Sequence, residues 1–167
     1  IIGVKQKYDD PFRNVASIMI NLMLQDRQPI IYGDGEQKRS FSDVDDCIYC
    51  IDKLATDPNI KSEVVNIGPG PENEITINEL FKNISNQLQF NKEPLYKPER
   101  VNEVKNAICS SSLAEKLFKH ESNQDIDGII DKMIEFIKSK GPKKFSYNYE
   151  IEINNELTPD TWSKKLI

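Results

Sequence analysis

The chain has 167 residues, of which 38% are hydrophobic and 29% are charged, a composition typical of one folded domain rather than of a disordered segment. Its 22 lysines and arginines and 27 aspartates and glutamates give a net charge of −5, which argues against nucleic acid and anionic membranes as partners. No apolar run approaches the roughly 18 residues of a membrane span, and the N-terminal apolar run meets Lys5 too soon for a signal peptide. We therefore expect a cytoplasmic protein whose cysteines are reduced thiols.

The N-terminal part of the chain alternates between extended and helical patterns. Ile1–Val4 is a β-type run, and the pair Asp10-Pro11 predicts the start of a helix that ends near Asp26. Pro29–Tyr32 predicts a short strand, and Lys38–Ser42 resumes an extended pattern. The glycines between these two segments permit positive φ, so we predict a compact strand-turn-strand unit.

The middle of the chain has the alternation of an α/β domain. Apolar residues from Val44 to Leu54 have helical spacing, and the pattern ends at Asp57-Pro58. Glu63–Gly68 carries a β-branched run that predicts a buried strand. Thr76–Glu79 has the spacing of a capping box and predicts a helix through Leu88.

The remaining segments predict a short extended piece, two helices and a tail. Pro94–Pro98 is extended, and Ser112–Glu115 has the spacing of a second capping box. An apolar stripe over Ile126–Ile137 predicts a helix that Gly141-Pro142 stops. Beyond it, apolar and polar residues alternate over 145–153, which predicts an extended tail that packs back. We therefore expect one domain over residues 1–142 and a C-terminal tail over 143–167.

Three local motifs have spacings known from active sites, and a structural role is favoured for each. Cys47-x-x-Cys50 has redox spacing, but two small apolar residues on one helix face are the favoured interpretation. Gly68-Pro69-Gly70 could be mistaken for a dinucleotide loop, but its proline lacks an N–H for pyrophosphate. Tyr49-x-x-x-Lys53 puts a phenol and an ammonium on one helix face, as proton abstraction requires, but no cofactor site accompanies it. Metal-ligand spacings are absent from the sequence.

The most informative run is IIYGDGEQKRSFSDVDD, residues 30–46. It resembles a segment of the extended short-chain dehydrogenases/reductases, the nucleotide-sugar epimerases and dehydratases. In that segment a strand and a Gly-Asp-Gly turn lead to a phosphate-binding arginine, and Val-Asp-Asp opens a helix. Further similar segments follow the family's order: Gly3–Gln6, Asp10–Val15, Asn66–Gly68, Thr76–Leu80 and Arg100–Val104.

The resemblance implies the fold class. It is α/β, the C-terminal substrate-binding part of an extended short-chain dehydrogenase/reductase, with short strands and several helices. The N-terminal Rossmann half would be largely absent. The tail is similar to that of a UDP-glucose 4-epimerase-like subgroup.

The resemblance also implies charged binding residues. Arg39 and Arg100 would clamp the diphosphate of a nucleotide sugar, a role that suits guanidinium because its planar fork meets phosphate oxygens bidentately. Glu103 stands where many family members have an aspartate that holds the ribose or orients the arginine. These side chains would supply much of the affinity for the diphosphate.

The remaining binding residues that the resemblance implies are apolar or neutral. Ile30 and Tyr32 would border the uracil, as an apolar slot with an aromatic wall. Asn14 and Val15, near the start of the first helix, would touch the pyrophosphate or the sugar.

The same resemblance places NAD and the catalytic tyrosine and lysine in the N-terminal half, so no catalytic residue and no NAD site is expected in this chain. The leading hypothesis is the substrate-binding portion of an NAD-dependent UDP-sugar epimerase or dehydratase, most like UDP-glucose 4-epimerase. Its partners would be a UDP-sugar, the NAD-binding half and, in a homodimer, a second copy. The alternative is a non-catalytic α/β module that binds a nucleotide or a protein.

Overall fold

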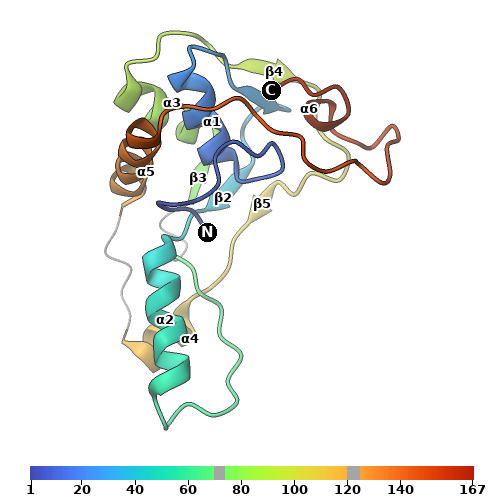
Figure 1. Cartoon of the computed structure of the whole chain (residues 1–167). Helices are drawn as coiled ribbons and strands as arrows, with labels where there is room; N and C mark the ends of the chain where they lie inside the picture. Colours follow the sequence, from blue (N-terminus) through green and yellow to red (C-terminus); the bar gives the residue numbers. More distant parts are fainter. Residues whose placement is uncertain (70–73, 120–124) are drawn as a thin grey trace.

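The computed structural model describes residues 1–69, 74–119 and 125–167, which form two unequal regions (Figure 1). The larger region, which we call the body, contains the main hydrophobic core and two small β-sheets. The smaller region, which we call the lobe, is built on helices α2 (Val44–Thr56) and α4 (Ser112–Phe118). The structure confirms an α/β fold with short strands and several helices.

Three helices supply most of the body's core: α1 (Val15–Leu24), α3 (Ile77–Leu88) and α5 (Ile126–Lys140). Their apolar faces meet in one buried cluster, to which Ile20 and Ile130 belong with no exposed surface. No helix in the described ranges combines the length and the apolar character needed to cross a lipid bilayer.

The ends of α3 and α5 confirm two predictions. Thr76 Oγ1 accepts a hydrogen bond from the Glu79 N–H (3.0 Å), and the Glu79 carboxylate accepts one from the Thr76 N–H (2.7 Å). This capping box starts α3, and the bond from Thr76 lowers the pKa of the Glu79 carboxyl. Gly141, at φ +81°, ends α5.

Helix α1 begins later than predicted. Asn14 is its N-cap, and the Asn14 side chain accepts from the Ala16 N–H at 2.8 Å. The buried Asp10 instead closes its own turn, because it accepts from the Phe12 N–H (3.0 Å) and pairs with Arg13 (3.2 Å). The expected start at Asp10-Pro11 is therefore wrong, since Asp10 caps a turn that the chain does not continue as helix.

The strands form two separate sheets. In one sheet, β1 (Ile30–Tyr32) runs parallel to β4 (Leu95–Lys97). In the other, β2 (Lys38–Ser40) is central, antiparallel to β3 (Glu74–Thr76) and parallel to β5 (Asn106–Ala107). The predicted strand-turn-strand unit is therefore not a hairpin, because its two strands pair with different neighbours.

Two predicted strands do not form. In Ile1–Val4 only Ile2 makes a bridge, to Asp43. Over Glu63–Gly68 the structure has no strand, and Val64 is 90% exposed. A β-branched run becomes a strand only where a neighbouring strand accepts its backbone hydrogen bonds, and no described segment does so here.

The lobe has a small core of its own. Cys50, Ala114 and Phe118 are buried between α2 and α4. The second predicted capping box is wrong, because α4 begins one residue early, with Ser111 as N-cap. Ser111 makes no side-chain cap bond, and its hydroxyl donates to the Glu115 carboxylate instead (2.8 Å).

The C-terminal segment, residues 143–167, which we call the tail, follows α5 across the body. Its one helix in the structure is the short α6 (Asp160–Ser163), which the sequence analysis did not predict. The division of the chain at residue 142 stays a prediction.

Candidate functional site

A cavity of about 390 Å³ lies where the start of α1, strands β1 and β2, the loop after β4 and the tail meet. We call it the arginine pocket. It is lined by every residue to which the sequence analysis assigned substrate binding: Asn14, Val15, Ile30, Tyr32, Arg39, Arg100 and Glu103. The fold thus brings these separate segments of the sequence to one place.

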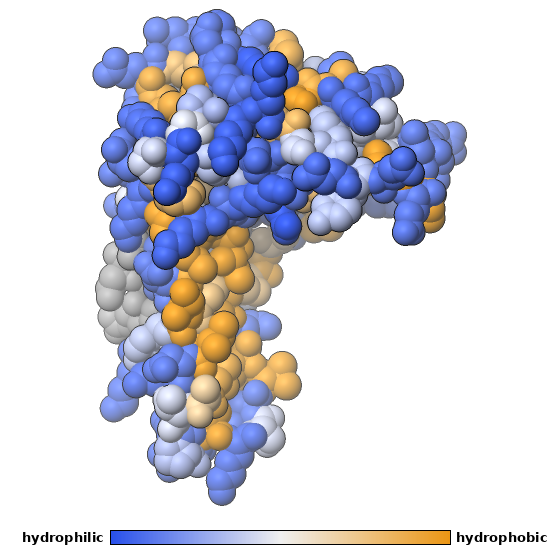
Figure 2. All heavy atoms as spheres, in the orientation of Figure 1, coloured by the Kyte–Doolittle hydropathy of each residue, from blue (hydrophilic) through white to orange (hydrophobic). Residues whose placement is uncertain are grey.

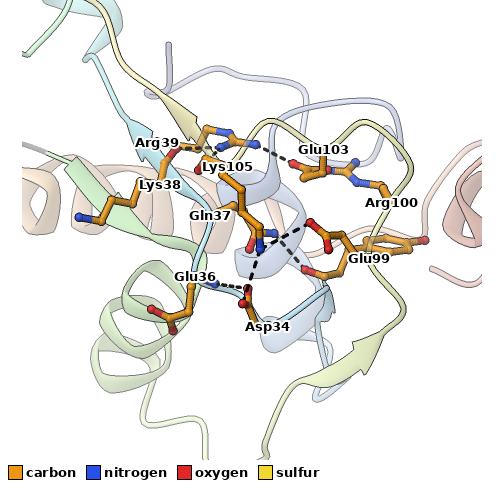
Figure 3. A network of polar contacts seen from close by, with 10 residues as sticks. Asp34, Glu36, Gln37, Lys38, Arg39, Glu99, Arg100, Glu103 and Lys105 are labelled. Carbon is orange, nitrogen blue, oxygen red and sulfur yellow. Dashed lines mark hydrogen bonds and ion pairs between the residues drawn. The ribbon is translucent and has the colours of Figure 1, made fainter.

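Glu103 joins the two arginines of the pocket (Figure 3). Its Oε1 lies 2.6 Å from an Nη of Arg39, and its Oε2 lies 2.5 Å from an Nη of Arg100. The Glu103 side chain is only 9% exposed, whereas those of Arg39 and Arg100 are 24% and 37% exposed. Two guanidinium groups therefore share one carboxylate, and the trio carries one excess positive charge.

Backbone carbonyls fix Arg39 further. Its second Nη donates to the carbonyl of Lys38 at 2.7 Å and to that of Lys105 at 3.4 Å. Because Arg39 lies on β2 and Lys105 directly precedes β5, these bonds hold the guanidinium at the edge of the three-stranded sheet. The charged group is in place before any ligand arrives.

Arg100 keeps unused hydrogen-bonding capacity. Its Nε is buried and has no hydrogen-bond partner among the described residues, and the same holds for the hydroxyl of Ser40, which also lines the pocket. Buried polar atoms without partners cost free energy, so a polar ligand that meets them gains by doing so.

The turn between β1 and β2 sets the position of Arg39. Gly33 and Gly35 both have positive φ, as predicted (+68° and +76°). A side chain at Gly35 would meet Asn78, because a Cβ there would lie 2.1 Å from Asn78 Oδ1. The Asn78 N–H donates to the Gly35 carbonyl (3.0 Å), which fastens the turn to the start of α3.

Exposed charges connect this turn to the loop that carries Arg100 (Figure 3). Lys105 Nζ lies 3.6 Å from Asp34 and 3.5 Å from Glu99. A backbone hydrogen bond from Glu36 lowers the pKa of Asp34, and the charges of Asp34 and Glu99 raise the pKa of Lys105. Because these groups are solvated, they orient the loop more than they stabilise the fold.

The N-terminus of α1 lies at the wall of the same pocket. Asn14 and Val15 line it, and the first turn of the helix contains no acidic residue. The partial positive charge of the helix end is therefore not offset locally, and it adds to the charge of the two arginines.

Aromatic and apolar groups also line the pocket, beside the charged ones. The Arg100 guanidinium stands 5.2 Å from the centre of the Tyr32 ring, and Ile30 lies on the same strand. The tail completes this lining with Thr161, Trp162 and Ile167, which the sequence analysis missed. The sequence pattern of the tail predicted that it packs back, but it assigned no residue of the tail to the site.

In the lobe, the Tyr49–Lys53 pair and the two cysteines, Cys47 and Cys50, make contacts that are typical of structural residues. Tyr49 Oη donates to the Phe118 carbonyl (3.1 Å), which joins α2 to α4, and Lys53 Nζ stands 5.4 Å from the Tyr49 ring centre. Cys47 and Cys50 are buried, and burial raises the pKa of both thiols, the reverse of what a reactive thiol needs. The rejected Gly68-Pro69-Gly70 loop falls partly outside the described residues, because Gly70 is not among them.

Comparison with known proteins shows a similarity to one enzyme family over part of the chain. Residues 2–68 match the model of the NAD dependent epimerase/dehydratase family. A protein of Methanocaldococcus jannaschii provisionally named UDP-glucose 4-epimerase is 40% identical over 103 residues, which are 62% of this chain and 32% of that protein. Over these residues the chain is therefore similar to the NAD-dependent epimerases and dehydratases.

Solved structures of epimerases have the same fold as this chain over most of its length. The UDP-glucose 4-epimerase of Thermotoga maritima, determined with UDP-glucose, is 29% identical with a TM-score of 0.72, over 83% of this chain and 43% of that one. The UDP-N-acetylglucosamine 4-epimerase of Methanobrevibacter ruminantium M1 is 26% identical with a TM-score of 0.75, over 84% of this chain and 44% of that one. The chain thus spans less than half the length of these epimerases.

Proposed function

We propose that this chain is the substrate-binding portion of an NAD-dependent nucleotide-sugar epimerase or dehydratase, most like UDP-glucose 4-epimerase, and that the arginine pocket binds a UDP-sugar. The observation that carries the proposal is the pair of arginines held by Glu103 in the same pocket as the N-terminus of α1. This arrangement offers several positively polarised donors over a short distance, which is what a diphosphate requires.

The pocket's charged and apolar groups suit the two parts of such a ligand. Arg39, Arg100 and the start of α1 would bind the diphosphate, and Glu103 would keep the guanidinium groups oriented. Ile30 and Tyr32 would border the uracil, and Asn14 and Val15 would touch the pyrophosphate or the sugar. Neighbours determined with UDP-glucose support this choice of ligand class.

NAD would bind outside this chain. Within the described ranges no buried strand leads into a glycine loop of the kind that holds the pyrophosphate of NAD, and Pro69 has no N–H to offer. Structures of related epimerases contain NAD, which serves as the hydride carrier in such enzymes. We therefore assign NAD and the catalytic groups to the rest of the protein.

The lobe offers a surface where that NAD-binding portion would dock. An apolar strip runs along the lobe in Figure 2, and on α2 Ile48 and Ile51 are 58% and 60% exposed. Exposed apolar strips of this kind mark contact surfaces. The relatives' additional length supplies the occupant, because more than half of each solved epimerase lies beyond the part that this chain matches.

Calorimetry with UDP tests the proposed pocket. We expect Arg39→Ala to weaken UDP binding roughly 10- to 100-fold, which is about 1.4–2.8 kcal/mol and within the range for a hydrogen bond to a charged group. Lys38→Ala is the matched control, because the side chain of Lys38 points away from the network in Figure 3. Equal affinity of Arg39→Ala and the unmodified chain would refute the assignment.

The native protein tests the enzyme assignment. We expect its intact mass in the source cells to be about twice the 19.2 kDa of this chain, and we expect it to interconvert UDP-sugars in the presence of NAD. UDP binding without any turnover by the intact protein would favour a non-catalytic nucleotide-binding module instead.

Paired substitutions test the docking surface. In the intact protein, Ile48→Lys combined with Ile51→Lys should reduce retention of NAD by separating the two portions, while UDP affinity of the 167-residue chain stays unchanged. Asp131→Lys is the control, since it adds a lysine at an exposed position of α5, in the body and away from α2. Normal NAD retention in the double variant would exclude this face.

A further inference from the structure

The tail supplies part of the wall of the arginine pocket. Thr161, Trp162 and Ile167 line the cavity, and Thr161 is only 9% exposed. These residues follow β1 and β2 by more than a hundred positions, so the pocket exists in its present form only while the tail is docked.

Tyr32 is the main attachment point of this wall. Its hydroxyl accepts from the Thr161 N–H at 2.9 Å and donates to Thr161 Oγ1 at 3.1 Å. The same ring faces Arg100. One side chain therefore contacts both the tail and an arginine of the pocket.

Other contacts hold the tail against the segment before α1. Trp162 Nε1 donates to the Pro11 carbonyl (3.2 Å), and the indole lies 5.4 Å from the Phe12 ring, centre to centre. Within the tail, the carbonyls of Thr161 (3.0 Å) and Ile167 (3.1 Å) both lie within hydrogen-bond distance of Tyr147 Oη, whose single O–H can donate to either. Burial raises the pKa of Tyr147, so this phenol stays protonated and able to donate.

The tail takes no part in the main core. The last buried member of that core is Ile137, on α5. The middle of the tail is open to solvent, with Tyr149 70% and Ile153 73% exposed. Among the described residues, the contacts of the final turn are therefore concentrated at the pocket, and losing them leaves the core intact.

We propose that residues 158–167 are a detachable wall of the arginine pocket and that docking of this wall and binding of the nucleotide stabilise each other, with Thr161 and Trp162 as contact residues for the nucleoside. This inference rests on the proposed function. A ligand that touches both the body and the tail has its full set of contacts only in the docked state, so it shifts the tail towards that state.

Trp162 provides a direct signal for this linkage, because it is the single tryptophan of the chain. We expect UDP to reduce acrylamide quenching of its fluorescence. In the absence of UDP, Tyr32→Phe should increase the quenching, because it removes the oxygen to which Thr161 bonds.

Binding measured by calorimetry completes the experiment. Deletion of 158–167 should lower UDP affinity roughly tenfold or more, while the urea unfolding of the body changes little. Thr161→Val should weaken binding less, because the Thr161 N–H still reaches Tyr32. Thr158→Val is the matched control, since Thr158 bonds within the tail, to the Ile153 carbonyl, and does not line the pocket.

The outcomes separate the two proposals. If the unmodified chain does not bind UDP, the proposed function fails and the linkage fails with it. If the unmodified chain binds UDP but the deletion variant binds it equally well, only the linkage is refuted. Quenching of Trp162 that does not respond to UDP in a chain that binds UDP would also refute it.

Discussion

The body and the lobe bury apolar surface to very different extents. The body's core joins α1, α3 and α5 in one large buried cluster, whereas the lobe's core consists of Cys50, Ala114 and Phe118 with a few half-buried neighbours. On α2 the lobe also leaves Ile48 and Ile51 more than half exposed. Since folding stability comes mainly from buried apolar surface, we expect the body to supply most of the folding free energy, and the proposed docking on the lobe would cover its exposed apolar face.

The largest difference in unfolding free energy should appear when the same substitution, isoleucine to alanine, is made once in the body and once in the lobe. Ile130→Ala, at a position with no exposed surface in the body, should lower the free energy of unfolding by about 2–5 kcal/mol. Ile48→Ala in the lobe should change it by less than about 0.5 kcal/mol, because that side chain is already in water. Urea unfolding followed by circular dichroism measures both. Equal losses would contradict the contrast between the regions.

Thiol labelling should report how firmly the lobe's small core is closed. Burial raises the pKa of Cys50, which lowers its thiolate population at a given pH, whereas Cys109 is partly exposed. At pH 8 we expect iodoacetamide to modify Cys50 roughly tenfold more slowly than Cys109, with a rate that rises only at higher pH. Mass spectrometry of the digested chain gives both rates, and equal rates would mean that the lobe opens freely.

The smallest effect concerns the two predicted capping boxes. Thr76→Ala removes a formed box in the body and should cost about 1 kcal/mol. Ser111→Ala in the lobe should cost less than Thr76→Ala, because Ser111 makes no side-chain bond to the helix backbone and loses only its hydrogen bond to the exposed Glu115 carboxylate. Thermal unfolding of the two variants distinguishes them, and a larger loss for Ser111→Ala would contradict the structure of α4.

Local signals in the sequence were sufficient for much of the body and for the charged part of the site. The capping box at Thr76 and the glycines at 33 and 35 act through neighbouring residues, and the structure has both. The family pattern selected Arg39, Arg100 and Glu103, and the structure brings all three together. Their role in binding stays a prediction.

Non-local features were not predictable. The run Glu63–Gly68 has the composition of a strand, but whether it pairs depends on a neighbour that its own residues do not specify. The contact of Thr161 with Tyr32 joins positions that no periodic pattern relates. The start of α1 was misplaced because two capping residues, Asp10 and Asn14, compete within five positions and only tertiary structure decides between them.

Glu103 is a counter-ion that the fold itself places beside the two arginines of the arginine pocket. It therefore affects how strongly the anions of a salt solution compete for these arginines. A small anion such as chloride must compete with a carboxylate that the fold already holds 2.6 Å from Arg39, and it offers few contacts in return. A longer anion could contact several of the polar residues that line the pocket, Arg100 and Ser40 among them, while Glu103 stays in place. We therefore expect background electrolyte to compete only weakly with a nucleoside diphosphate for the arginine pocket.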